Sequence, residues 1–203
     1  MATLMGEEEL RHVAPLGVHI ALRIGFAFPL EEINTLPAPW VEQYSRQRLM
    51  MYDPVMRWAY TNTGAVRWSA LEGQDDQRKV LQQAKTFGLK FGVTVSVADE
   101  AGDGQRSFGS FLRSDREFSD LEVNLLRAYM TRRHTETAPP TNLTRAELEA
   151  LRMIKDGKRL KEIAFELGVT EGAVKQRLKN AKLKLDAKTS TQAAALANQY
   201  GLL

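Results

Sequence analysis

The chain has 203 residues, of which 43% are hydrophobic and 26% charged, and its formal net charge is +3; this composition predicts a folded protein and excludes a disordered one. It contains no cysteine, which excludes disulfides, thiolate catalysis and thiolate metal sites. No apolar run approaches the roughly 20 residues that cross a bilayer, and the acidic N-terminus lacks the apolar core of a secretory signal, so we expect a cytoplasmic protein with no membrane partner.

Strand-like and helix-like segments alternate along the first two thirds of the chain. Alternating apolar patterns predict strands at 17–26, 64–72, 91–100 and 106–114. Residues 101–104, Ala-Gly-Asp-Gly, are typical of a hairpin turn between the last two strands, which indicates antiparallel pairing. Helices are predicted at 39–51, at 75–88 and from Ser119 to Arg133. We therefore expect an α+β fold in which residues 1–134 form an α/β/α sandwich with a mainly antiparallel sheet.

A polar stretch, RRHTETAPPTN at 132–142, follows these elements. It shows no apolar periodicity, and Ala138-Pro139-Pro140 disfavours a helix. We interpret the stretch as an exposed connection and place the linker at 135–142, with a second domain at 143–203.

The second domain begins with helix signals at regular intervals. Thr144 and Glu147 have the spacing of a capping box, and Gly157 stands where the first helix should stop. A second helix, LKEIAFEL, ends at Gly168, and Thr170 can cap a third helix, EGAVKQRLKNAKLKL. The order helix, tight turn, helix is typical of DNA-binding proteins.

The third of these helices is predicted to separate apolar from cationic residues. Ala173, Val174, Leu178 and Ala181 can face the core. The opposite face carries Lys175, Gln176, Arg177, Lys179 and Lys182. From residue 143 onward the chain has 12 Lys and Arg against 7 Asp and Glu, whereas residues 1–142 have 16 against 18. Such a face can lie in the major groove of DNA, although a helical interaction domain kept soluble by its lysines would show the same charges.

The second domain resembles the LuxR-type helix-turn-helix over nearly its whole length. The matching features are LTxxE, Leu151, Gly157, the run KEIAFELGVTEGAVKQRLKNAKLKL and the final segment STQAAALANQYGLL. The resemblance implies an all-α four-helix domain that binds double-stranded DNA through its third helix, with Thr170 and the polar residues just named as its contacts. It also implies a homodimer in which the last helix, with Ala194, Ala197 and Tyr200, pairs with a second copy.

The first domain lacks the acidic cluster and strand-ending aspartate of a phosphoacceptor receiver. Instead Trp40, Tyr44, Asp53-Pro54, Trp68 and Gly92 resemble, in order and spacing, the signature of the acyl-homoserine-lactone-binding domain of quorum-sensing regulators. The resemblance implies that Trp40 donates to the lactone carbonyl and that Asp53 accepts from the ligand amide. Tyr44 and Trp68 would enclose the ring, and Ser110 would add a polar contact.

Other interpretations of these residues stay open. Tyr44 and Trp68 can be ordinary core aromatics, and Asp53 can be the N-cap of the short helix PVMRWAY. The chain also departs from the family where a tyrosine usually precedes the tryptophan by one turn, because Leu36 stands there. A lost hydrogen bond of this kind typically costs about 0.5–1.5 kcal/mol. The segment before the signature is shorter than usual, so an N-terminal helical element is expected to be shortened or absent.

These features together predict a quorum-sensing transcriptional regulator that responds to an acyl-homoserine lactone. The alternative is a ligand-independent LuxR-type regulator, or a heterodimerising anti-activator with a degenerate pocket. An enzyme is not predicted, because no nucleophile-base arrangement or phosphate loop is visible. His12, His19 and His134 are scattered without metal-ligand spacing, so we interpret them as surface or hydrogen-bonded side chains and expect no cofactor.

Overall fold

The computed structural model describes residues 5–25, 28–73, 76–99 and 105–203, and the chain divides into two units, Met1–Thr137 and Ala138–Leu203. The predicted hairpin turn at 101–104 lies outside the described residues. The first unit contains α1 (Glu7–Val13), β1 (Gly17–Ile24), β2 (Pro29–Asn34), α2 (Ala38–Arg46), α3 (Pro54–Thr61), β3 (Gly64–Arg67), α4 (Val80–Thr86), β4 (Phe91–Ala98), β5 (Arg106–Arg113) and α5 (Asp120–Glu136). The second contains α6 (Arg145–Lys155), α7 (Leu160–Leu167), α8 (Glu171–Lys184) and α9 (Ser190–Gln199).

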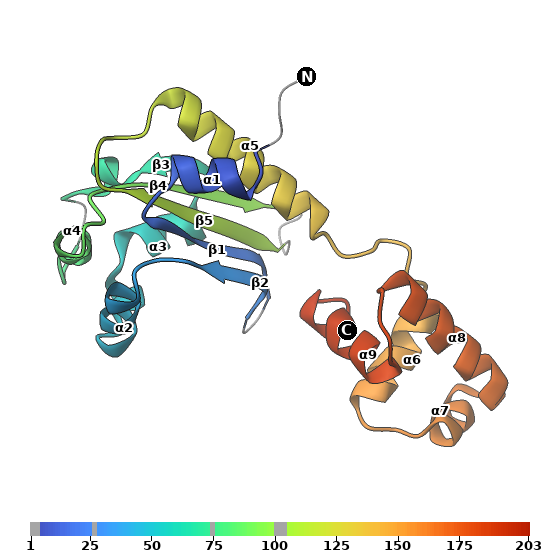
Figure 1. Ribbon diagram of the computed structural model, residues 1–203. Helices are drawn as coiled ribbons and strands as arrows, with labels where there is room; N and C mark the ends of the chain where they lie inside the picture. Colours follow the sequence, from blue (N-terminus) through green and yellow to red (C-terminus); the bar gives the residue numbers. More distant parts are fainter. Residues whose placement is uncertain (1–4, 26–27, 74–75, 100–104) are drawn as a thin grey trace. The chain divides into compact units, whose positions relative to one another are not determined.

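The first unit is a single antiparallel sheet between two layers of helices. The strand order is β2-β1-β5-β4-β3, and every neighbouring pair is antiparallel. Helices α1 and α5 cover one face, and α2 and α3 lie on the other (Figure 1). This arrangement confirms the predicted α/β/α sandwich. None of the helices in the described ranges is long and apolar enough to span a membrane.

Side-chain alternation decides which residues form the sealed core of this unit. Val18, Ile20 and Leu22 of β1 point to the same face because strand residues two apart share a side. They pack with Leu126 and Met130 of α5, both fully buried. The opposite face of the sheet turns toward α2 and α3 and contains the cavity described below.

Several predicted boundaries in the first unit were wrong for local reasons. The helix predicted at 39–51 ends at Arg46, because Arg48 adopts a left-handed conformation with φ 52° and a 3₁₀ turn follows. The helix predicted from residue 75 begins only at Val80, after Lys79 with φ 54°. The strand predicted at 64–72 ends at Arg67, and a 3₁₀ turn from Trp68 to Leu71 replaces its second half.

Two elements had not been predicted, and one was longer than predicted. The edge strand β2 has mostly half-buried or exposed residues, so its sequence PLEEIN shows little apolar alternation. The short helix α1 supplies Leu10 to the core. Helix α5 continues to Glu136, so Thr135 and Glu136, which we had placed in the linker, are helical.

The second unit contains the four predicted helices. Thr144 Oγ1 accepts from the Glu147 N–H at 3.3 Å, and Glu147 accepts from the Thr144 N–H at 2.7 Å, which confirms the capping box. Gly157 and Gly168 end α6 and α7 with φ 80° and 63°. The buried Glu147 also accepts from Lys184 of α8 at 2.8 Å. Burial alone would raise the pKa of Glu147, but the Lys184 ammonium lowers it overall, so the ion pair ties α8 to α6.

A buried polar cluster holds the C-terminal end of α5 against the sheet. Arg23 lies at an irregularity of β1 with φ 51°, and its guanidinium donates to the His134 carbonyl at 2.9 and 2.7 Å and to Asp99 at 2.5 Å. The His134 ring contacts Asp99 at 3.0 Å and Ser107 at 2.7 Å. Burial and the Arg23 charge lower the pKa of His134, so the folded protein keeps this imidazole neutral near pH 7.

We predict that acid destabilises the first unit through His134. Because its pKa is lower in the folded state, the unfolded state binds more protons below about pH 6.5, and stability falls as the pH drops. His134→Gln cannot titrate, so its unfolding midpoint should change less than that of the wild type between pH 7.5 and 5.5. Thermal unfolding across this range tests this, with His12→Gln, on an exposed α1 residue, as the control. An equal pH dependence in His134→Gln and wild type would contradict it.

Candidate functional site

A cavity of about 220 Å³ lies between the sheet and helices α2 and α3 of the first unit. All six residues that the sequence predicted for ligand binding line it: Leu36, Trp40, Tyr44, Asp53, Trp68 and Ser110. They come from the segment between β2 and α2, from α2 itself, from the N-cap of α3, from the turn after β3 and from β5. Segments far apart in the sequence therefore meet around one space.

Trp40 and Tyr44 form the aromatic wall of the cavity. They are one helical turn apart on α2, and their ring centroids are 5.4 Å apart in an edge-on arrangement. Trp40 is only 4% exposed, and among the described residues its indole N–H has no hydrogen-bond acceptor. The nitrogen atom itself is not sealed from open space, so this N–H is available to an acceptor inside the cavity.

Asp53 has one of the two roles predicted for it, that of the N-cap of α3, and it also binds Tyr44, which had not been predicted. One carboxylate oxygen accepts from the Val55 N–H at 2.8 Å and caps α3, and the other accepts from the Tyr44 hydroxyl at 2.7 Å. Burial raises the pKa of Asp53, and the hydrogen bonds oppose this shift. Burial and the neighbouring carboxylate also raise the pKa of Tyr44, which therefore stays a neutral donor. A carboxylate has about four acceptor positions, so capping leaves Asp53 able to accept from a further donor.

Trp68 lies flat against the sheet with its polar atom already engaged. Its indole N–H donates to Thr94 Oγ1 at 3.0 Å, and Thr94 Oγ1 lies 2.8 Å from Ser110 Oγ. A Cβ atom at Gly92 would come within 2.4 Å of the Trp68 ring, so only glycine leaves room for the indole. Trp68 is thus both a core aromatic and a cavity wall, and only its ring surface is free to meet a ligand.

Polar residues of the edge strand β2 and its neighbour β1 also line the cavity, and they had not been predicted there. They are His19 of β1 and Glu32 and Asn34 of β2. His19 Nε2 lies 3.0 Å from Glu32 Oε1. His19 could have been identified from the alternation of β1, whereas the sequence of β2 gives little signal because most of its residues are half-buried or exposed.

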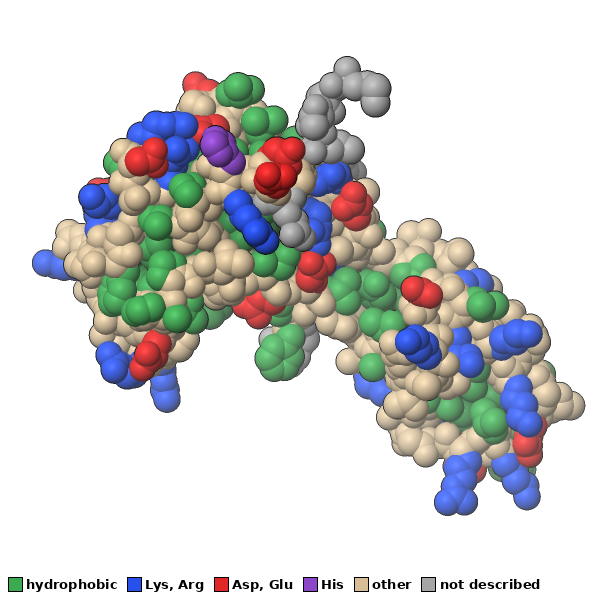
Figure 2. Space-filling model, viewed as in Figure 1, with side chains coloured by type: hydrophobic (Ala, Val, Ile, Leu, Met, Phe, Trp, Pro, Cys, Tyr) green, Lys and Arg blue, Asp and Glu red, His purple; other side chains and the backbone are tan. Residues whose placement is uncertain are grey.

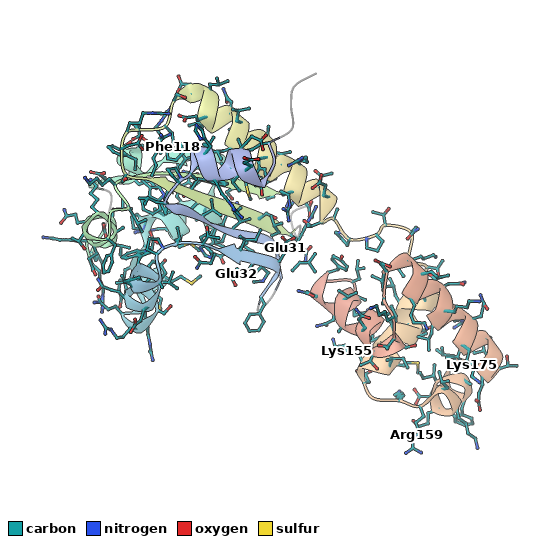
Figure 3. All side chains as sticks on the ribbon, in the orientation of Figure 1. Glu31, Glu32, Phe118, Lys155, Arg159 and Lys175 are labelled. Carbon is teal, nitrogen blue, oxygen red and sulfur yellow. The ribbon has the colours of Figure 1, made fainter. Side chains whose placement is uncertain are left out.

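Helix α8 presents the cationic face expected of a DNA-reading helix. Val174, Leu178 and Ala181 are buried, whereas Lys175, Gln176 and Lys179 are exposed. Arg177 and Lys182 are half-buried. Thr170 Oγ1 accepts from the Ala173 N–H at 3.2 Å as the N-cap, and its side chain is exposed. Figure 2 shows lysine and arginine side chains over α7 and α8, and Figure 3 labels Lys175 among them.

Cations at the start of α7 extend this surface and had not been singled out from the sequence. Arg159 and Lys161 are exposed there, and Arg159 is labelled in Figure 3. Lys158 is less available because it forms an ion pair with Glu166.

The structure corrects the role expected for two alanines of the last helix. Ala194 and Ala197 are 2% and 0% exposed, because α9 packs against the core of its own unit. Neither side chain can contact a second copy in this arrangement. Tyr200 is half-buried in the same core, and the outward residues of α9 are Thr191, Gln192, Ala195 and Asn198.

Comparison with known proteins gives matches to both units. Residues 29–135 match the family described as autoinducer binding domain, and residues 141–197 match bacterial regulatory proteins of the luxR family. The quorum-sensing regulator RhlR of Pseudomonas aeruginosa is 31% identical over 197 residues, covering 89% of this chain and 79% of RhlR. The transcriptional activator VanR of Vibrio anguillarum is 29% identical, covering 79% and 72%. The crystal structure of Escherichia coli SdiA is similar with a TM-score of 0.52 and 25% identity, covering 98% of this chain and 93% of SdiA.

We predict that Gly92→Ala displaces Trp68 and destabilises the first unit by about 1–3 kcal/mol, the usual cost of overpacking. Thermal unfolding and the near-ultraviolet circular dichroism of the indole would measure this. The control is Gly172→Ala in α8, where the new Cβ atom meets nothing closer than Thr170 Oγ1 at 3.7 Å. A wild-type unfolding midpoint for Gly92→Ala would show that Trp68 does not lie against this glycine.

Proposed function

The chain belongs to the LuxR family of quorum-sensing transcriptional regulators, with an autoinducer-binding domain followed by a helix-turn-helix domain, and from this we propose that its cavity binds an acyl-homoserine lactone that controls DNA binding. The observation that carries the proposal is the pairing of a free donor with a spare acceptor in one cavity. Trp40 offers an indole N–H, and Asp53 offers the unused acceptor capacity of its carboxylate.

The polar groups of an acyl-homoserine lactone complement this pair. The lactone carbonyl oxygen can accept from Trp40, and the amide N–H can donate to Asp53. Tyr44 takes part indirectly, because its hydroxyl is bound to Asp53 and holds the carboxylate in position. The ring surfaces of Tyr44 and Trp68 then enclose the ligand.

Ser110 can supply a hydrogen-bond donor for the acyl carbonyl oxygen, which the apolar side chain of Leu36 cannot. The buried Thr94 hydroxyl accepts from the Trp68 N–H and shares a hydrogen bond with Ser110 Oγ in which either hydroxyl can donate. When Thr94 is the donor, the Ser110 hydroxyl hydrogen can donate to the acyl carbonyl oxygen in the cavity. Leu36, half-buried in the cavity lining, contributes only apolar contact.

We propose that the regulator acts as a homodimer on double-stranded DNA in the bacterial cytoplasm, where the chromosome lies. Lys175, Gln176, Arg177, Lys179 and Lys182 of α8 would contact bases and phosphates, with Thr170 at the start of the helix. Ligand binding would change the fraction of protein able to dimerise on DNA, which requires tighter binding to one state than to the other. A second copy would meet the outward residues of α9.

A second candidate is a regulator of the same family whose pocket no longer senses a ligand, acting alone or by forming inactive heterodimers. Two observations favour it. Leu36 adds no hydrogen bond, and the Asp53 carboxylate already accepts from Tyr44 and Val55. Such a protein would keep its cavity residues for stability alone.

The first test is thermal unfolding with a panel of acyl-homoserine lactones of different chain lengths. A ligand that binds the folded state stabilises it by about 2.7 kcal/mol at 100 times its Kd. Asp53→Asn keeps an oxygen to cap α3 but places amide hydrogens where the ligand N–H must donate, so the shift should disappear. The control is Asp76→Asn, because Asp76 caps α4 and does not line the cavity. No shift with any lactone would favour the second candidate.

The DNA-reading face is tested by gel shift on duplexes selected from a random library. Lys175→Ala and Lys179→Ala should each weaken binding. Loss of one phosphate contact should reduce the slope of log affinity against log salt concentration by about one. Lys188→Ala removes the same charge from an exposed site beyond α8 and should bind almost as the wild type does. Unchanged affinity in both α8 variants would contradict the assigned face.

A further inference from the structure

A row of polar residues crosses the floor of the cavity. Asn34 of β2 pairs with His19 of β1, His19 with Ser110 of β5, and Ser110 with Thr94 of β4. Directly paired residues share a face of the sheet, so all four point toward α2 and α3. Exposure to solvent accounts for the polarity of Asn34, but not for that of the half-buried His19 or of the buried Ser110 and Thr94.

The two halves of the row differ in how their hydrogen bonds are satisfied. The inner half, Thr94 and Ser110, is completed by the Trp68 indole. In the outer half, His19 Nε2 lies 3.0 Å from a Glu32 carboxylate oxygen, which can only accept, so Nε2 carries the hydrogen. No described residue is a hydrogen-bond partner of the other ring nitrogen, Nδ1.

Asn34 adds a donor beside these acceptors. Its side-chain oxygen accepts from the Leu36 N–H at 3.1 Å, and no described residue accepts from its NH₂ group. The outer half therefore offers the Glu32 carboxylate as an acceptor, the Asn34 amide as a donor, and His19 Nδ1, which accepts when it carries no hydrogen. A hydroxyl group can both donate and accept, whereas a ketone oxygen can only accept and a methylene can do neither.

The size of the cavity limits the ligand that reaches these groups. Its volume of about 220 Å³ is below the range of about 300–1,000 Å³ that is usual for ligand pockets. A ligand that fills it touches both the side formed by Trp40 and Asp53 and the side formed by β1 and β2. A bare hydrocarbon chain would remove water from His19, Glu32 and Asn34 without replacing the hydrogen bonds.

We propose that the cavity selects a short acyl-homoserine lactone whose chain carries a hydroxyl group, bound by His19, Glu32 and Asn34. This inference rests on the proposed lactone binding and adds the class of acyl chain. The hydroxyl hydrogen is donated to the His19 ring nitrogen or the Glu32 carboxylate, and the hydroxyl oxygen accepts from Asn34.

The test measures the Kd of the full-length protein for hexanoyl-, 3-oxohexanoyl- and 3-hydroxyhexanoyl-homoserine lactone by isothermal titration calorimetry. One to two neutral hydrogen bonds correspond to a roughly 2- to 10-fold preference for the hydroxylated ligand over the unsubstituted one. The Kd of the 3-oxo ligand should lie between those of the other two, since its oxygen can accept from Asn34 but cannot donate. His19→Leu, which is similar in volume and apolar, should remove the preference while keeping binding of the hexanoyl ligand.

A second variant and a control separate loss of specificity from loss of folding. Glu32→Ala changes a half-exposed side chain that can be removed without opening the core, and it should also reduce the preference. His12→Leu, on the opposite helix layer, should keep it. Equal Kd values for the hexanoyl and 3-hydroxyhexanoyl ligands in the wild type, or a preference that survives both cavity variants, would overturn the inference while lactone binding stands. Failure of all three ligands to bind would overturn lactone sensing itself and this inference with it.

Discussion

The carboxylate of Asp53 is the group on which the sensor cavity depends. A buried carboxylate is costly unless its oxygens accept hydrogen bonds. One oxygen caps α3, and the other binds the Tyr44 hydroxyl of α2, so one side chain fixes two helices that line the cavity. The same constraint orients the unused acceptor positions toward the space that Trp40 also faces. The carboxylate oxygens that hold α2 and α3 together are therefore also the atoms proposed to bind the ligand.

One sheet serves two different purposes because its faces alternate in character. The face under α1 and α5 is closed by apolar residues such as Ile20, Leu22 and Phe111. The face under α2 and α3 carries a polar row, part of which is completed internally by the Trp68 indole. The first face supplies stability, and the second can specify a ligand. The Arg23 cluster holds the C-terminal end of α5 against the sheet through hydrogen bonds to the His134 carbonyl.

In the second unit, packing decides which residues of α8 are free to meet DNA. Val174 and Leu178 anchor the helix in the core, and the buried pair of Glu147 and Lys184 fixes its C-terminal half to α6. Because Lys184 is paired with Glu147, it is not available to DNA, although the sequence alone does not distinguish it from the other lysines of α8. Helix α9 packs closely through small alanines, which leaves Thr191, Gln192, Ala195 and Asn198 on its outward side.

The sequence by itself determined the features that depend on near neighbours in the chain. These include the capping box of Thr144 and Glu147, the glycine stops of the helix-turn-helix, and the shared face of Trp40 and Tyr44, because residues three or four apart meet within one helical turn. Only the tertiary structure decided that His19 and Glu32 line the cavity, that Thr94 accepts from Trp68, and that Arg23 binds the end of α5. The last of these contacts joins residues that are 111 positions apart in the sequence. Strand register and helix packing bring such residues together, and no local sequence pattern reports on either.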